Sequence, residues 1–459
     1  MSSRHGSRQK GIIVRSFFLD LRDRTGIIQC VGGAELKDVP TEGVLKVKAL
    51  IKERPERMIN PHVTTGSIEL EILAHEILSR SETIPFPIDT DGYEIDEELR
   101  LRHRYIDLRR TRMTHNMLMR SKVLLWLRNY LSALQFVEIE TPILTKSTPE
   151  GARDFVVPSR LQQGKWYALP QSPQQYKQML MVAGFERYFQ VARCFRDEDP
   201  RADRAYGEFT QLDIEMSFVS QEDLLRLTED MFTSLVRELF PEKTISASPW
   251  PRLSHALAQE KYQTDKPDLR KDPKNPDELA FCWVIDYPLF TTQSKEDYFH
   301  GSGSANLAPS HHMFTAPHPD DVTLLDTAPA KVRGLQHDLV LNGFEVGGGS
   351  IRIHDPVIQQ KVFDIIGFSK EDSAQFGYLM QAFSYGVPPH GGIAPGIDRF
   401  LMALLGEPSV REVIAFPMTS GGTTAVMDAP SMISLQQSEE LGLLHNGKKT
   451  EKIEQKGNS

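Results

Sequence analysis

The sequence has few of the features that mark zinc-binding or membrane proteins. Its 459 residues include only three cysteines, Cys30, Cys194 and Cys282, and their wide separation makes no metal-ligand motif. No run of apolar residues approaches the roughly 20 residues of a transmembrane helix. The sequence therefore excludes a cysteine-based zinc site and a membrane-spanning helix, and it predicts a cytoplasmic protein with reduced thiols.

An excess of positive charge is also missing, since the formal net charge is −9. This value argues against a protein that binds nucleic acid through its overall charge. The charge at the start of the chain is different, because the basic residues before Gln29 outnumber the two acidic ones, Asp20 and Asp23. Such a locally basic module can still bind a phosphate backbone. The acid-poor start is also typical of a transit peptide, but residues 18–29 already have the pattern of a folded segment. The basic residues are Arg4, Arg8, Lys10, Arg15, Arg22 and Arg24.

The length predicts two or three domains. Residues 10–85 contain short β-rich runs separated by glycine-containing turns, which predicts a small Greek-key barrel of the OB-fold type. Proline and aspartate in residues 81–92 indicate a linker. We therefore predict a barrel domain over 1–85, a linker over 86–115, a main domain over 116–435 and a partly disordered tail over 436–459.

The most distinctive stretch is FQVARCFRDEDPRADRAYGEFTQLDIEMSF, residues 189–218. Apolar residues alternate with polar ones on both sides of a highly charged centre, which predicts two antiparallel strands joined by a long charged loop. A salt-bridged surface loop is the plain alternative for this centre. A second long apolar pattern, which includes Met117, Val123, Leu127 and Leu131, predicts an amphipathic helix that leads into residues 136–144.

Three stretches together resemble one family. R-C-F-R-D-E, R-A-D-R and E-F-T-Q-L-D-I-E, within residues 189–218, resemble motif 2 of the class II aminoacyl-tRNA synthetases in its aspartyl form. FVEIETPIL, residues 136–144, resembles motif 1, and GGIAPGIDRFLMALLG, residues 391–406, resembles motif 3. QSPQQYKQ, residues 171–178, lies between the first two. Three motifs in the right order are far more specific than any one of them, and the resemblance covers residues 18–431.

The resemblance implies an α+β fold. The N-terminal barrel would bind the tRNA anticodon, and the catalytic domain would be an antiparallel β-sheet flanked by helices. The helix before motif 1 and the motif 1 strand would form a homodimer interface, although the same helix could pack inside its own domain. The implied activity is the ATP-dependent attachment of L-aspartate to its tRNA through an aspartyl-adenylate.

The resemblance also implies the residues that bind ATP. Arg196 would contact the α-phosphate and the substrate carboxylate, and Arg399 would contact the γ-phosphate, so both are the expected catalytic residues. Asp338 and Glu345 would hold Mg²⁺, which favours carboxylate oxygens; ordinary strand-edge carboxylates are the alternative for this pair. The full expected ATP site is Arg196, Asp197, Glu198, Glu345, Gly396, Ile397, Asp398 and Arg399.

For the amino acid, the resemblance implies that Glu150 accepts a hydrogen bond from the α-ammonium group, while Lys177 and Arg352 bind the side-chain carboxylate. Gln174 lies three residues before Lys177, so both share one helix face. A zinc site at His311 and His312 is a weak alternative, because adjacent histidines lack useful ligand spacing. The expected aspartate site is Glu150, Gln174, Lys177, Arg196, His311 and Arg352.

For the tRNA, the resemblance implies that Phe18 stacks on an anticodon base, with Arg22 and Gln29 close by. The pattern alone favours a different role for Phe18, as part of the barrel core. The tRNA specific for aspartate is the expected partner, and the asparagine tRNA stays open as a second one.

The sequence departs from the family pattern in three places. The family has a further strand, which ends in a glycine-rich turn, before the position of Phe18, and the seventeen residues that precede Phe18 match it poorly. Either the barrel lacks a strand or the assigned start of the chain is wrong. The large inserted domain of bacterial-type members is absent before residues 281–290. In motif 2, Ala205-Tyr206-Gly207 replaces a Gln-Pro pair whose glutamine contacts ATP in the family, which puts ATP affinity in question.

Two other functions remain as alternatives. The first is a related enzyme with another product, either an asparaginyl enzyme or an asparagine-forming paralogue; the latter normally lacks the barrel that residues 10–85 predict. The second is a non-catalytic tRNA-binding paralogue, against which the presence of Arg196, Glu345 and Arg399 argues.

Overall fold

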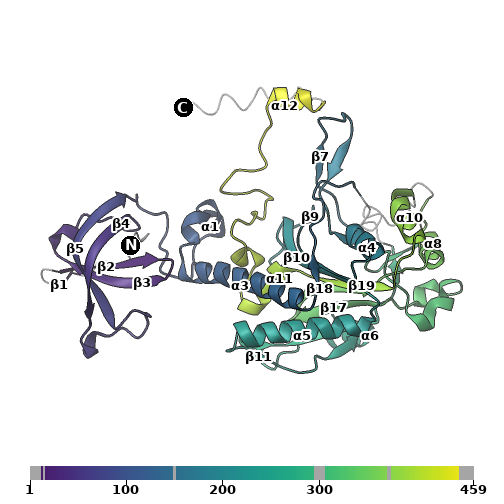
Figure 1. Ribbon diagram of the computed structural model, residues 1–459, viewed down its shortest axis with the longest axis horizontal. Helices are drawn as coiled ribbons and strands as arrows, with labels where there is room; N and C mark the ends of the chain where they lie inside the picture. The colour runs from purple at the N-terminus through teal and green to yellow at the C-terminus, as the bar shows by residue number, and fades with distance from the viewer. Residues whose placement is uncertain (1–11, 14–15, 148–150, 294–304, 370–373, 444–459) are drawn as a thin grey trace. The chain divides into compact units, whose positions relative to one another are not determined.

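The structure is a computed structural model that describes residues 12–13, 16–147, 151–293, 305–369 and 374–443. The chain divides into two compact units, Met1–Arg112 and Met113–Ser459, and each is described separately (Figure 1). Within the described ranges, no helix combines the length and apolar character needed to cross a membrane.

The first unit contains a five-stranded sheet in the order β1-β2-β3-β5-β4. Neighbouring strands are antiparallel, except that β3 and β5 pair in parallel. Two residues of a first strand, β1, lie within the described ranges and pair with β2. The elements are β1 (Ile12–Ile13), β2 (Ser16–Asp23), β3 (Gly26–Gly32), β4 (Val44–Glu53) and β5 (Ile68–Ser79), with the 3₁₀ helices η1 (Ala34–Leu36) and η2 (Glu56–Met58).

Side-chain alternation along β2 separates the barrel core from its other face. Leu19 and Leu21 are buried in the core together with Cys30 of β3. Because successive strand residues point to opposite faces, Phe18 lies on the face away from these residues, and its side chain is half-buried. The interpretation of Phe18 as a core residue is therefore wrong.

Residues 86–112, where the sequence predicts a linker, are folded. They contain α1 (Glu97–Arg102) and α2 (Arg104–Asp107), and Phe86, Ile88 and Ile106 are buried together beside them. The carboxylate of Asp107 is fully buried and accepts hydrogen bonds from three arginine side chains. These donors are Arg100 (Nε at 3.1 Å), Arg104 (Nη1 at 2.8 Å) and Arg110 (Nε at 2.8 Å).

The second unit is built on an eight-stranded sheet in the order β12-β14-β17-β18-β19-β10-β9-β6. The six central strands are antiparallel, and the edge strands β12 and β6 pair in parallel with their neighbours. The strands are β6 (Val137–Glu138), β9 (Arg187–Arg196), β10 (Gly207–Ser217), β12 (Arg252–Ser254), β14 (Phe281–Ile285), β17 (Gln336–Leu341), β18 (Phe344–Ile351) and β19 (His390–Pro395).

The helices α3, α5 and α11 pack on this sheet, and α5 lies along it in Figure 1. The helices are α3 (Thr111–Ala133), α4 (Gln174–Val182), α5 (Gln221–Leu239), α6 (His255–Tyr262), α8 (Pro356–Ile365), α10 (Gly377–Ser384), α11 (Ile397–Leu405) and α12 (Leu435–Glu440). Smaller elements are the strand pairs β7–β8 (Val156–Pro158, Trp166–Ala168), β11–β13 (Thr244–Ile245, Glu278–Leu279) and β15–β16 (Phe290–Thr292, Leu307–Pro309), and the 3₁₀ helices η3 (Pro319–Leu325), η4 (Pro329–Lys331) and η5 (Val410–Val413).

The main core lies between the sheet and the helices α3, α5 and α11. Leu212 and Ile214 of β10 point into it and pack with the apolar faces of these helices. The predicted hairpin is confirmed, because β9 and β10 pair antiparallel from Arg196–Gly207 to Arg187–Met216. Burial of alternate residues on one face of β10 leaves the intervening side chains on the opposite face, and these are polar.

Candidate functional site

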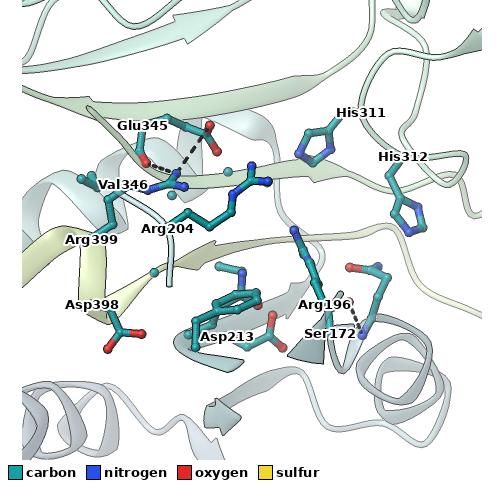
Figure 2. A pocket seen from close by; sticks show the side chains of 18 of the residues that line it. Ser172, Arg196, Arg204, Asp213, His311, His312, Glu345, Val346, Asp398 and Arg399 are labelled. Atoms are coloured by element: carbon teal, nitrogen blue, oxygen red, sulfur yellow. Dashed lines mark hydrogen bonds and ion pairs between the residues drawn. The ribbon is translucent and has the colours of Figure 1, made fainter. Parts of the chain in front are cut away.

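A cavity of about 230 Å³ lies on the polar face of β10. Gln211 and Asp213, which alternate with the core residues of that strand, line it. Side chains from α4, β9, β18 and α11 complete the lining, so strands and helices far apart in sequence supply the site. Figure 2 shows Arg196 and Arg204 reaching into the cavity between Glu345 and the two histidines.

Four buried charged side chains lie together at the floor of the cavity: Lys177, Asp213 and Arg352 line it, and Glu215 is bound to Lys177 and Arg352. The Nζ of Lys177 lies 2.6 Å from Oδ1 of Asp213 and 3.0 Å from Oε2 of Glu215. Arg352 donates from Nε to Oε1 of Glu215 at 3.1 Å and from Nη1 to Ser350 Oγ at 2.7 Å. The two cations and two carboxylates compensate one another, which is the condition under which charges are stable in a protein interior.

The two carboxylates differ in acidity. Burial alone would raise the pKa of Glu215, but Arg352 and Lys177 outweigh it and hold this pKa at about 2. For Asp213, burial raises the pKa by more than Lys177 lowers it. Its Oδ2 atom is buried and has no hydrogen-bond partner of normal geometry among the described residues, and the nearby hydroxyl of Tyr188 donates to Gln190. Asp213 therefore presents an acceptor that a ligand with an N–H group could use.

Gln174 and Arg196 point further polar groups at the same space. α4 begins at Gln174, one turn before Lys177, and Nε2 of Gln174 is a buried donor without a partner among the described residues. Arg196 donates from Nε to the carbonyl oxygen of Gln171 at 3.4 Å and lies over the ring of Phe209, 5.1 Å from its centroid. No described carboxylate lies within ion-pair distance of Arg196, in contrast to the other cations that line the cavity.

At the opposite end of the cavity, Arg399 lies beside Glu345 (Figure 2). Its Nη1 donates to the carbonyl oxygen of Glu345 at 2.6 Å and lies 3.7 Å from Oε2 of the same residue. Nε of Arg399 donates to the carbonyl oxygen of Asp203 at 3.0 Å. These bonds fix the direction of the guanidinium group of Arg399, which lines the cavity.

Asp338 lies next to Glu345 behind the cavity wall. Burial and the Glu345 carboxylate raise the pKa of Asp338 well above its usual value. Its Oδ1 is buried without a hydrogen bond, and a Cβ atom at Gly348 would lie 2.9 Å from it and 3.3 Å from Nε2 of His311. Glycine at position 348 therefore lets a carboxylate and an imidazole approach the same stretch of β18.

The structure brings most of the predicted site residues together. The cavity lining includes Gln174, Lys177, Arg196, Glu198, His311, Glu345, Arg352, Gly396, Asp398 and Arg399.

Three predicted residues have a different place or role. Ile397 is buried in the main core, so its side chain does not reach the cavity. Asp197 lies outside the lining and accepts a hydrogen bond from Tyr206. Asp398 lines the cavity, but Arg120 Nη1 (2.5 Å) and the backbone N–H of Thr210 (2.8 Å) bind its two oxygens, which indicates a structural role. Glu150 lies outside the described residues.

Sequence reasoning did not identify Asp213, Glu215 and Gln171. The first two lie in the QLDIE segment of motif 2, where their alternation with Leu212 and Ile214 was the available signal. Gln171 is buried, and its side-chain amide bonds both backbone groups of Ala152, with Oε1 to N at 2.9 Å and Nε2 to O at 2.8 Å. The backbone carbonyl of Gln171 accepts a hydrogen bond from Arg196, so Gln171 links the segment after motif 1 to Arg196.

In the first unit, Phe18, Arg22 and Gln29 share one face of the sheet, since Gln29 pairs with Asp20, which lies between the other two. Phe18 and Gln29 are half-buried side chains on that face. Arg22 donates from Nη2 to the buried carboxylate of Glu42 at 2.7 Å and lies 3.3 Å from the carbonyl oxygen of Arg109. The geometry thus gives Arg22 a structural role within the unit.

Comparisons with known proteins identify one family. The family model described as "tRNA synthetases class II (D, K and N)" matches residues 96–420. The chain is 40% identical to an aspartate–tRNA(Asp/Asn) ligase of Rubrobacter xylanophilus, over 95% of this chain and 92% of that protein. It is 36% identical to an aspartate–tRNA ligase of Staphylococcus epidermidis, over 96% of this chain and 95% of that protein.

The fold is similar to the crystal structure of asparaginyl-tRNA synthetase from Pyrococcus horikoshii complexed with asparaginyl-adenylate. The TM-score is 0.71 at 20% identity, over 90% of this chain and 94% of the other, so this likeness concerns the fold alone. The alignment with the Rubrobacter protein extends over 568 positions, which exceeds the 459 residues of this chain. That relative therefore has segments without a counterpart here, in agreement with the absence of a large inserted domain.

Proposed function

The chain belongs to the class II tRNA synthetases of the D, K and N type, and from this premise we propose that it attaches L-aspartate to tRNA through an aspartyl-adenylate, using ATP. Two relatives bear the names of aspartate–tRNA ligases at 36% and 40% identity over nearly the whole chain. ATP is the energy source of this enzyme class. The structural support comes from the charge pattern on the floor of the cavity.

The observation that carries the proposal is the pairing of Lys177 and Arg352 at that floor. The ammonium of Lys177 and the guanidinium of Arg352 have eight N–H donors in total, and the bonds to Asp213, Glu215 and Ser350 leave some of them for a ligand. Neither cation offers an acceptor. A carboxylate side chain is therefore matched, whereas the amide NH₂ of asparagine would place a buried donor against two positive groups.

The remaining groups suit the rest of the amino acid. We assign the α-ammonium group to the buried Oδ2 atom of Asp213, and the α-carboxylate to Arg196, which has no carboxylate partner among the described residues. In the first step, an oxygen of this α-carboxylate forms a bond to the α-phosphorus of ATP, and the bond from that phosphorus to pyrophosphate breaks. Arg196 and Arg399 would neutralise the charge that develops on the phosphates.

Mg²⁺ fits the donors at the far end of the cavity. Asp338 has a buried oxygen without a partner, and its raised pKa reflects burial and the nearby carboxylate of Glu345. A divalent cation would relieve this repulsion, and carboxylate oxygens are its preferred ligands. We therefore propose that Asp338 and Glu345 hold the Mg²⁺ of the nucleotide, which would withdraw charge from the phosphate oxygens. Described residues form no cluster of three or more metal-binding side chains, so phosphates and water would complete the shell.

We also propose a homodimer that forms through α3 and the motif 1 region. α3 buries Met119, Val123 and Leu127 in the main core, yet it exposes Leu118 and Leu125 on its other side. The predicted interface exceeds roughly 1,000 Å². Sedimentation that shows only monomer at micromolar concentration would contradict it. Further exposed apolar side chains near the edge strand β6 are Val137, Ile143 and Leu144.

The decisive test of the proposed function is ATP–pyrophosphate exchange with aspartate, asparagine and lysine in turn. We expect exchange with aspartate and preference over asparagine by about 10⁴-fold in kcat/KM, because a site with unpaired polar groups rejects the wrong side chain strongly. Preference for asparagine would favour the asparaginyl alternative, and no exchange with any of the three would favour a non-catalytic paralogue. Charging of aspartate and asparagine tRNAs then defines the tRNA partner.

A further inference from the structure

Tyr206, in the part of motif 2 that departs from the family pattern, makes a side-chain bond within its own loop. Its hydroxyl donates to Oδ1 of Asp197 at 2.9 Å. This hydrogen bond raises the pKa of Tyr206, so the donor stays protonated near neutral pH. Asp197 and Tyr206 are the first and last residues between β9 and β10, which end and begin at the paired residues Arg196 and Gly207. The bond therefore closes the base of the charged loop.

The loop carries two groups of the cavity within this closed base. Glu198 and Arg204 both line the cavity, and Arg204 Nη1 lies 2.6 Å from Oε2 of Glu198. Neither Asp197 nor Tyr206 lines it. Asp197 lies between Arg196 and Glu198 in the chain, so a bond that fixes Asp197 also restricts the backbone from which both of these side chains extend.

The ring of Tyr206 contacts two other segments. It packs edge-on against Phe155, with ring centroids 5.9 Å apart and an interplanar angle of 86°. The backbone N–H of Asp197 donates to the carbonyl oxygen of Arg153 at 3.0 Å, so the same segment after motif 1 is bound twice. On another side, a Cβ atom at Gly422 would lie only 2.9 Å from Cε1 of Tyr206. Gly422 belongs to a turn in which its N–H donates to the carbonyl oxygen of Thr419.

We propose that Tyr206 is a positioning residue for nucleotide binding. Its hydroxyl holds Asp197, and its ring, enclosed by Phe155 and the turn at Gly422, anchors the motif 2 loop so that Glu198 and Arg204 face the cavity. This inference rests on the proposed use of ATP. The motif 2 loop of this chain lacks the glutamine that contacts ATP in the family pattern. Tyr206, which lies outside the cavity, would instead support ATP binding by holding this loop in place.

The first test is a pair of substitutions, Tyr206→Phe and Asp197→Asn, each of which weakens the same bond while retaining shape. Both should weaken ATP binding, measured by calorimetry with MgATP, by roughly tenfold, which is the scale of one lost hydrogen bond to a charged group. The KM for aspartate should stay within about twofold. Since one bond is at issue, the double variant should bind ATP no more weakly than either single variant.

The second test acts on the ring from outside the loop. Gly422→Ala places a methyl group against the Tyr206 ring and should weaken ATP binding in the same way. Gly422 has a left-handed φ of +73°, so backbone strain needs a control. Gly164→Ala is the matched control, because Gly164 has a φ of +79° with no heavy atom near its Cβ position, and ATP affinity should not change.

Three results would overturn the inference. These are unchanged ATP affinity in both Tyr206→Phe and Asp197→Asn, equal losses for ATP and aspartate accompanied by a lower Tm, or additive losses in the double variant. Calorimetric ATP binding does not depend on turnover. A parental protein that binds ATP but exchanges no pyrophosphate would therefore contradict the proposed function alone, and one that binds no ATP would contradict both.

Discussion

Arg352 and Glu215 form a two-point ion pair in the interior of the second unit. Nε and Nη2 of the guanidinium group lie 3.1 and 3.4 Å from Oε1 and Oε2 of the carboxylate. A Cβ atom at Gly392 would lie 2.1 Å from Oε2 of Glu215, so the glycine of motif 3 makes room for this carboxylate. Glu215 thus orients the guanidinium group of Arg352. The N–H groups of Arg352 that do not bind Glu215 are left for a substrate.

The first prediction concerns this arginine. Arg352→Leu should lower kcat/KM for aspartate by about 10³-fold or more, because a carboxylate ligand loses half of its cationic site. The preference for aspartate over asparagine should narrow, since the repulsion of the amide NH₂ falls as well. Measurement of kcat/KM for both amino acids by pyrophosphate exchange provides the ratio.

The same substitution leaves Glu215 buried with Lys177 as its only ion-pair partner among the described residues, so it should also destabilise the fold by about 3–5 kcal/mol. Stability and selectivity must therefore be separated. Arg193→Leu serves as the control, because Arg193 lies on β9 in an exposed ion pair with Glu208 and should change neither quantity. If the ratio of kcat/KM for aspartate to that for asparagine were unaltered in Arg352→Leu, Arg352 would not bind the amino-acid side chain.

The second prediction concerns pH. The pKa of Glu215 is about 2 in the fold, below its usual 4.5, so the folded state favours the charged form. Its contribution to the free energy of unfolding is fully present above pH 4.5 and is lost as pH falls through about 2. Across that window the loss amounts to at most about 3 kcal/mol. The raised pKa of Asp213 acts in the opposite direction, because its protonation favours the fold.

Urea denaturation between pH 7 and pH 3 tests this prediction. Glu215→Gln should be less stable than the parental protein at pH 7, because Arg352 and Lys177 lose a carboxylate partner. Its stability should nevertheless fall less steeply below pH 4.5, since the titrating group is gone. Parallel curves for the two proteins would show that Glu215 does not titrate as the ion pair requires.

The sequence predicted the elements with a strong local pattern. The hairpin of motif 2 followed from alternation over many residues, and the strands of the barrel followed from short β-rich runs with glycine turns. The motif resemblance also placed Lys177, Arg196 and Arg352 in one site, although they are far apart in the chain. Composition and periodicity do not show which residues from distant segments lie together, whereas the resemblance to a family does.

What escaped prediction depends on partners from distant segments. Whether Arg22 faces tRNA or Glu42 is decided by the fold of residues 104–110, and no local signal in β2 distinguishes the two. Asp213 and Glu215 belong to a visible alternating pattern, but their significance depends on cations from α4 and from the segment after β18. Within the predicted linker of 86–115, residues 86–112 form two helices around an apolar cluster and the buried carboxylate of Asp107, and no local pattern indicates these contacts.

The third prediction concerns the proposed metal. Glu345→Gln removes one anionic oxygen beside Asp338 and Arg399 and should slow adenylate formation by about 10²-fold or more at fixed Mg²⁺. The fold should persist, because the backbone carbonyl of residue 345 still accepts from Arg399. Pyrophosphate exchange over a Mg²⁺ titration provides the measurement, with Glu208→Gln as an exposed-carboxylate control. A parental rate at every Mg²⁺ concentration would show that Glu345 is not a ligand.

The fourth prediction concerns the barrel. Phe18 lies on the face that it shares with Gln29, away from the core residues Leu19 and Leu21. We therefore expect its ring to stack on a base of the tRNA. Phe18→Ala should weaken tRNA binding by about 1–3 kcal/mol and leave pyrophosphate exchange without tRNA unchanged. The neighbouring Leu19→Ala is the matched control, because it removes a core side chain and should lower stability by about 2–5 kcal/mol. If Phe18→Ala and Leu19→Ala lost similar amounts of stability, Phe18 would have a structural role and the proposed contact with tRNA would be wrong.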